Sequence, residues 1–172
     1  MPRRASLEAA ISDTTTAWNT GPFAEPARQR LAQHQHTLMR VLERYDELVS
    51  RVHRDSYRVT THGEPHRGNV IMTPDGPAVI DWDTTRRAPR ERDLWSLIAQ
   101  DSSVRAHYEE LAGTPLDDDT LRLYELWWDL CEVSLFIHDF RHRHEHHADT
   151  ETAWKGLTTH LDPSRWRDVL AT

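Results

Sequence analysis

Side chains that can act as acids, bases or metal ligands are concentrated in one octapeptide of this sequence, HGEPHRGN at residues 62–69. It holds two histidines, one glutamate and one asparagine, and glycines interrupt it near both ends. So many polar groups in eight residues are not typical of a segment whose only role is packing. Three interpretations are open: a cluster of metal ligands, a loop for phosphoryl transfer, or a polar turn without chemistry.

The spacing of Glu64, Asn69 and Asp81 favours the second interpretation. Asn69 lies five residues after Glu64, and Asp81 lies twelve residues after Asn69, at the end of a predicted hairpin. Mg²⁺ prefers hard oxygen ligands, which Asn69 and Asp81 offer as a carbonyl and a carboxylate. Glu64 is a separate carboxylate that could accept the proton of an attacking hydroxyl. A kinase catalytic loop has the same order: His-x-Asp, an asparagine five residues later, a hairpin and a metal-binding aspartate.

The stretch THGEPHRGNVIMTPDGPAVIDWDTTRRAPRERDLW, residues 61–95, closely resembles the C-terminal lobe of the aminoglycoside phosphotransferase and choline kinase family, a branch of the protein-kinase-like fold. The resemblance implies an ATP- and Mg²⁺-dependent enzyme that phosphorylates a hydroxyl of a small molecule. It implies that Asn69 and Asp81 bind the metal and that Glu64 stands where the family has its catalytic aspartate. This is a departure, because glutamate has one more methylene and reaches about 1.5 Å further.

The same resemblance assigns supporting roles to four other residues. His62 and His66 are expected to shape the loop, and Asp83 to be a second acidic group near the metal. Asp93 is expected to be a structural aspartate that precedes the next helix. The residues that would bind the nucleotide are not identified.

The Gly-rich turn and strand lysine that hold nucleotide phosphates in such enzymes have no counterpart in this sequence, whose only lysine is Lys155. We therefore expect residues 1–172 to form a single domain, the substrate- and Mg²⁺-binding lobe, without the nucleotide lobe. On this interpretation the chain alone is inactive, and it associates with a missing lobe or with itself. A pseudokinase-like binding or scaffold module is the main alternative, so whether the chain is an enzyme stays open, as does the acceptor (aminoglycoside-like or amino-alcohol).

Two histidine patterns suggest other metals. A metal-dependent hydrolase would use His62, His66, Asp81 and Asp83 as ligands of a transition metal. In the stretch HDFRHRHEHH, a continuous helix would place three histidines on one face, although a solvated helix end is the simpler interpretation. These histidines are His138, His142 and His146.

Composition narrows the partners. The net charge of −7 argues against a general nucleic-acid binder and is compatible with a cationic small-molecule substrate. The single cysteine excludes a disulfide within the chain. No apolar run approaches the ~18 residues of a membrane span, and the N-terminus lacks an apolar signal core. We therefore expect no membrane contact and a cytoplasmic location.

The elements that must position the site are mostly helices, which makes the fold class α+β with a short β-hairpin. Apolar periodicity and breaker residues predict a single hairpin over residues 69–82. The helix expected over residues 116–142 should be central, because it is apolar on two faces. Helices are predicted over residues 6–18, 26–53, 92–100, 103–113, 116–142, 149–161 and 163–171.

Overall fold

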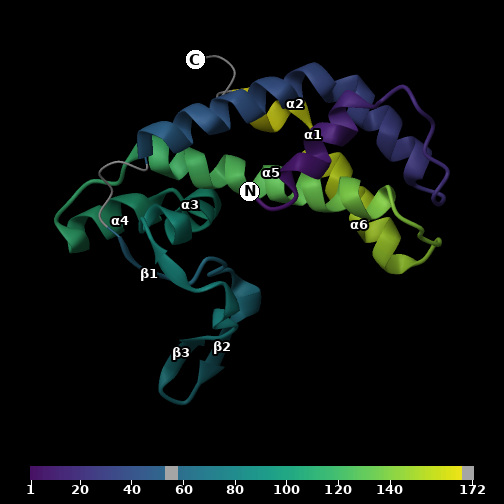
Figure 1. Cartoon of the computed structure of the whole chain (residues 1–172). Coiled ribbons are helices and arrows are strands. Elements are labelled where there is room, and N and C mark those ends of the chain that lie inside the picture. The colour runs from purple at the N-terminus through teal and green to yellow at the C-terminus, as the bar shows by residue number, and fades with distance from the viewer. Residues whose placement is uncertain (53–57, 168–172) are drawn as a thin grey trace. The chain divides into compact units, whose positions relative to one another are not determined.

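The computed structural model describes residues 1–52 and 58–167 (Figure 1). The chain divides into two compact units. One contains Met1–Asp46 and Leu126–Thr172, and the other contains Glu47–Glu125. Helix α2 (Ala24–Val52) begins in the first unit and ends in the second, whereas α5 (Asp118–Phe140) runs from the second unit into the first.

The first unit is helical. Besides its parts of α2 and α5, it contains α1 (Arg4–Ser12), α6 (Ala148–His160) and a 3-10 helix, η3 (Pro163–Trp166). The apolar side chains that recur every three or four residues along α2 and α5 are buried here, as the sequence predicts. Fully buried members are Leu31, Leu38, Leu130, Val133 and Ile137, and Leu157 of α6 and Trp166 of η3 are fully buried as well.

A buried carboxylate ties the end of the first unit to α5. Asp129 is only 2% exposed, and it accepts hydrogen bonds from His160 Nδ1 (2.9 Å), Arg165 Nη2 (2.7 Å) and Nε (3.0 Å), and Trp166 Nε1 (3.1 Å). Burial alone would raise the pKa of Asp129, but the hydrogen bonds from His160 and Arg165 outweigh it and lower that pKa. Asp129 therefore anchors η3 as a charged group.

The second unit carries the candidate site and all the strands of the described chain. Its strands are β1 (Val59–Thr61), β2 (Val70–Thr73), β3 (Gly76–Val79) and β4 (Arg86–Ala88). Two 3-10 helices, η1 (Arg67–Asn69) and η2 (Trp82–Thr84), flank the β2–β3 hairpin. Helices α3 (Glu91–Gln100) and α4 (Ser103–Ala112) follow.

The β2–β3 hairpin confirms the predicted one with tighter limits. Val70 pairs with Val79 and Thr73 with Gly76, which leaves Pro74 and Asp75 as the turn. Gly76 has φ +116°, a backbone conformation that residues with a Cβ rarely adopt. Beyond Val79 the chain leaves the strand, so Asp81 and Trp82 fall outside the ladder.

A second antiparallel pair was not predicted from the sequence. Strands β1 and β4 pair with Val59 opposite Ala88 and Thr61 opposite Arg86. The predicted hairpin stands, but this second strand pair was missed, because its strands are short and far apart in the chain. Their pairing brings the start of the octapeptide loop next to the segment that follows Asp81.

Several helix limits also differ from the predictions. Helix α1 ends at Ser12, not at residue 18, because the polar run Asp13–Thr16 turns away; Thr16 Oγ1 donates to Asp13 Oδ1 (2.8 Å). Helix α5 ends at Phe140, so the predicted helical row of His138, His142 and His146 is wrong. The predicted ends at His53 and residue 171 lie outside the described residues.

Candidate active site

The loop between β1 and β2 is held at its start by Asp93. This carboxylate lies in the first turn of α3 and accepts hydrogen bonds from the backbone N–H groups of His62 (2.7 Å) and Gly63 (2.6 Å). Such charge-assisted hydrogen bonds are short and strong. They fix the position and direction of the backbone that leads into Glu64.

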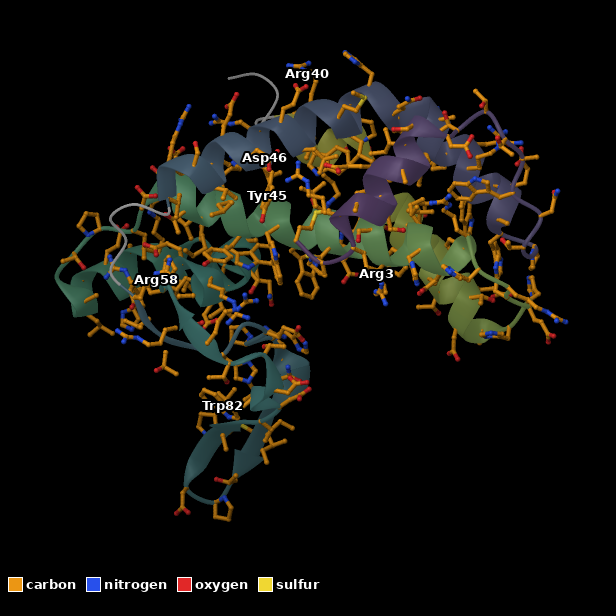
Figure 2. The ribbon with its side chains drawn as sticks, in the orientation of Figure 1. Arg3, Arg40, Tyr45, Asp46, Arg58 and Trp82 are labelled. Carbon is orange, nitrogen blue, oxygen red and sulfur yellow. The ribbon has the colours of Figure 1, made fainter. Side chains whose placement is uncertain are left out.

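The imidazole of His62 connects this loop to the end of the hairpin. Its Nδ1 accepts from the backbone N–H of Glu64 (3.2 Å), and its Nε2 lies 2.8 Å from the backbone oxygen of Ile80. Because a carbonyl oxygen can only accept, the ring proton belongs on Nε2. Trp82, which Figure 2 shows at the base of the hairpin, packs edge-on against this ring with centroids 4.7 Å apart.

Asn69 closes the loop onto the hairpin. Its side-chain Nδ2 donates to the backbone oxygen of Glu64 (3.0 Å), which leaves the side-chain oxygen available as an acceptor. Its backbone oxygen accepts from the N–H of Ile80 (2.9 Å). Asp81 is thus the residue directly after the hydrogen-bonded partner of Asn69.

Asp81 combines an unusual backbone with an exposed carboxylate. Its φ of 65° and ψ of 62° are left-handed, a region that aspartate enters more readily than most residues. Its side chain makes no hydrogen bond or ion pair with the residues that the structure describes. Strained backbone that carries an unengaged polar group is typical of a functional position.

The other predicted residues lie on the same segments. His66 Nδ1 accepts from the N–H of Gly68 (3.1 Å) and so caps η1, which agrees with a loop-shaping position. Glu64 is half-buried, and its carboxylate has no hydrogen bond within residues 1–52 and 58–167. Asp83 is exposed in η2. The catalytic role of Glu64 and the metal-binding roles of Asn69 and Asp81 stay predictions.

Sequence patterns missed three residues that hold this loop from beneath. Thr84 Oγ1 donates to the backbone oxygen of His62 (2.6 Å). Arg92 donates through Nη1 to Thr61 Oγ1 (2.8 Å) and through Nη2 to the backbone oxygen of Thr84 (3.0 Å). The adjacency of Arg92 to Asp93 and the glycine at position 63 were the available signals, and neither specifies a contact by itself.

The geometry does not support the alternative site for a transition metal. Backbone groups engage both ring nitrogens of His62 and one nitrogen of His66. Within the described part of the chain, no three side chains of His, Cys, Asp or Glu are grouped to hold a metal ion. The histidine-rich segment is included: His138 and His142 lie 4.2 Å apart by ring centroids, but His146 lies near Glu151 instead.

Comparison with known proteins places this site in a family. A model of the phosphotransferase enzyme family matches residues 4–136, which include the whole loop, the hairpin and α3. The chain belongs to the phosphotransferase enzyme family. The resemblance found in residues 61–95 is thereby confirmed.

Curated relatives of this phosphotransferase-family chain include Protein StrN of Streptomyces griseus. The two are 28% identical over 165 residues, which cover 93% of this chain and 47% of StrN. Stress response kinase A of Escherichia coli K12 is 36% identical over 66 residues, or 36% of this chain and 20% of that protein. The chain thus spans about half the length of StrN.

Solved structures confirm the fold class. The complex of spectinomycin phosphotransferase APH(9)-Ia with ADP and spectinomycin matches with a TM-score of 0.73 at 18% identity, over 95% of this chain and 54% of that chain. Its AMP-bound complex matches with a TM-score of 0.72 over 92% of this chain and 52% of that chain. The predicted protein-kinase-like fold, mostly helical with a short hairpin, is therefore correct. No helix within the described ranges is long and apolar enough to cross a bilayer.

Proposed function

We propose that this chain is the substrate- and metal-binding lobe of a small-molecule phosphotransferase, which transfers phosphate from ATP to a hydroxyl group. The observation that carries the proposal is the joining of Asn69 and Ile80 by a backbone hydrogen bond (2.9 Å), which brings Asp81 to the loop that holds Glu64. Three oxygen-bearing side chains with separate tasks therefore come from one small region of the second unit.

The donor set at this site fits Mg²⁺. The side-chain oxygen of Asn69 and the carboxylate of Asp81 are hard ligands without partners among the described residues. Two protein ligands are ordinary for Mg²⁺, which keeps waters and substrate phosphates in its remaining positions. When bound, the ion would neutralise the charge that develops on the transferred phosphoryl group.

Glu64 supplies the remaining chemistry. A carboxylate that no neighbour engages is free to accept a hydrogen bond from a substrate hydroxyl and then its proton. The loop holds the backbone of Glu64 through His62 Nδ1 on one side and Asn69 Nδ2 on the other. The backbone of Glu64 is therefore fixed, and its side-chain torsions, one more than an aspartate has, remain to be set on binding.

Two features of the relatives support the choice of substrates. One neighbour of known structure was solved with ADP and spectinomycin, and the other was solved with AMP. We extend this to ATP and a small hydroxylated acceptor, aminoglycoside-like or an amino alcohol, for the present chain. Completion of the enzyme requires a nucleotide-binding lobe, because the described residues offer no Gly-rich loop or strand lysine to hold ATP phosphates.

Metal binding by the chain itself tests the site without requiring turnover. We expect titration with Mn²⁺, followed by electron paramagnetic resonance, to show one site in the 172-residue chain. Asp81→Asn should weaken it roughly tenfold or more, as loss of a metal-site group commonly does. Asp75→Asn is the matched control, because Asp75 is an exposed aspartate at the opposite end of the same hairpin. Equal binding by wild type and Asp81→Asn would remove Asp81 from the site.

A chimera tests the reaction. The nucleotide-binding half of a two-lobed family member, joined to residues 1–172, should transfer labelled phosphate from ATP to one of a panel of amino-sugar and amino-alcohol acceptors. Mn²⁺ binding without any transfer or ATP hydrolysis in a folded chimera would favour a non-catalytic binding module instead.

A further inference from the structure

A buried arginine packs closely against the backbone of the candidate loop. Arg92 is 2% exposed and is the second residue of α3. Its Nη1 donates to Thr61 Oγ1 on the last residue of β1, and its Nη2 donates to the backbone oxygen of Thr84 at the end of η2. One planar guanidinium therefore joins the segment that enters the loop to the segment that follows Asp81.

The two threonines extend these contacts, one to the loop and the other to β4. Thr84 Oγ1 donates to the backbone oxygen of His62 (2.6 Å), and Thr61 Oγ1 donates to the backbone oxygen of Arg86 (2.9 Å). We call Thr61, Thr84 and Arg92 the arginine bracket. Through Thr84 the bracket binds the backbone oxygen of His62, whereas the carboxylate of Asp93 binds the backbone N–H groups of His62 and Gly63.

Gly63 shows how closely the loop rests on the bracket. A Cβ at this position would lie 2.1 Å from Arg92 Nη2 and 2.6 Å from Thr84 Oγ1, and the residue has φ +105°. Both the contact and the backbone conformation therefore require glycine. The glycine of the His-Gly-Glu sequence permits direct packing of the loop backbone on the guanidinium.

The charge of Arg92 is not used in an ion pair with a hydrogen-bonded carboxylate. Its side-chain hydrogen bonds go to neutral oxygens, and its Nε is buried without a partner among the described residues. Burial lowers the pKa of Arg92, and Arg86 lowers it further, whereas Asp93, Tyr124 and Glu64 oppose this. A buried cation held in this way stabilises a fold weakly, because its desolvation offsets its contacts.

We propose that Arg92 is a positioning residue, which fixes the loop bearing Glu64 and Asn69 relative to the hairpin end bearing Asp81 and thereby sets the affinity of the site for a divalent cation. The inference rests on the proposed function, since it takes Asn69 and Asp81 as the ligands. Loss of positioning and loss of charge would change the affinity for the cation in opposite directions. Removal of a nearby cation should by itself tighten binding of a divalent cation, because it removes Coulomb repulsion, whereas loss of positioning should weaken it.

The test is Mn²⁺ titration of the full 172-residue chain and its variants, with thermal unfolding measured on the same samples. Arg92→Met replaces the buried cation by an apolar chain of similar length, which removes the desolvation penalty of the cation together with its two hydrogen bonds. We expect Arg92→Met to keep a cooperative unfolding transition and to raise the Mn²⁺ dissociation constant about tenfold, as loss of outer support does at metal sites. Arg92→Lys should weaken binding similarly, because one ammonium cannot replace two fixed guanidinium donors.

Two further variants complete the experiment. Thr61→Val removes one acceptor of the bracket at nearly constant shape and should weaken Mn²⁺ binding several-fold, and it decides the matter if Arg92→Met does not fold. Arg90→Met is the matched control: Arg90 also makes a two-point contact, with Thr114 Oγ1 and the backbone oxygen of Pro115, and among the described residues its side chain makes no hydrogen bond or ion pair with the loop. It should leave Mn²⁺ binding unchanged.

Each result separates the two proposals. Wild-type chain that binds no Mn²⁺ would overturn the proposed function and this inference with it. Wild-type binding that is equal or tighter in folded Arg92→Met and Thr61→Val would overturn the role of Arg92 alone. Full affinity in Arg92→Lys would show that charge matters, not the two-point contact, and would also overturn the positioning role.

Discussion

Replacement of Asp129 by asparagine should destabilise the first unit strongly. The carboxylate accepts four hydrogen bonds from three residues, His160, Arg165 and Trp166, and Arg165 is a cation that donates two of them. Asparagine keeps one acceptor oxygen and turns an NH₂ group toward donors that it cannot satisfy. Breaking hydrogen bonds to charged groups costs about 1.5–3 kcal/mol each. With two such bonds lost, and with Arg165 35% exposed, we expect a loss of roughly 3 kcal/mol.

Thermal unfolding followed by circular dichroism measures this loss. At this chain length about 2–4 °C corresponds to 1 kcal/mol, so Asp129→Asn should lower Tm by roughly 10 °C. The matched control is Asp46→Asn, at a position that Figure 2 labels on α2. Asp46 pairs with Arg4, but it is exposed, so its loss should cost less than about 1 kcal/mol.

The effect should also depend on pH in a defined direction. The pKa of Asp129 is lowered from its ordinary 3.8, so its contribution is complete above that pH and is lost as the pH falls through the folded-state value. The Tm difference between wild type and Asp129→Asn should therefore be constant at neutral pH and narrow below about pH 4. A difference under about 2 °C at pH 7, equal to that of Asp46→Asn, would refute the reasoning.

Three further predictions concern the second unit. Gly63→Ala should destabilise the chain by about 2–4 kcal/mol, measured by urea unfolding, because it adds backbone strain and a clash with Arg92; an unaltered midpoint would contradict the packing of the loop on Arg92. In the chimera, Glu64→Gln should lower kcat by roughly a hundredfold or more with little change in nucleotide affinity, and Glu64→Asp should keep more activity; unimpaired Glu64→Gln would remove the proposed base. The hairpin exposes a cluster of large apolar side chains, including Met72 at 78%, so the chain should associate at high concentration in sedimentation experiments. Met72→Lys should reduce this association, whereas Leu111→Lys, at an equally exposed position on α4 (75%), should not.

The features that sequence predicted well are those with a local signal. Helix α5 was predictable because its apolar residues recur with helical spacing, and the hairpin because PDG separates two β-branched runs. The spacing of Glu64, Asn69 and Asp81 was sufficient to predict the loop–hairpin arrangement. In each case the residues that cooperate are near one another in the chain.

The features that were missed depend on distant contacts. Strand β1 is three residues long, and its partner β4 follows the whole hairpin, so no local pattern reveals the pair. Arg92 lies at an amphipathic helix start, where an arginine is ordinarily solvated. Its burial follows from the approach of Gly63 and Thr84, which sequence spacing does not specify. The prediction for the histidine-rich segment was wrong for the opposite reason. It extended the helix past Phe140 on a regular local pattern that the backbone does not follow.

The pairing of β1 with β4 also has a consequence for the order of folding. The β2–β3 hairpin contains only local contacts and can form early, whereas the ladder that joins Val59 to Ala88 must first close the chain around it. Loop closure has an entropic cost that only the completed ladder and its neighbours repay. Glu64, Asn69 and Asp81 all lie inside that closed segment. The hairpin can therefore form without the β1–β4 ladder, whereas the relative placement of these three residues also requires the ladder to close around it.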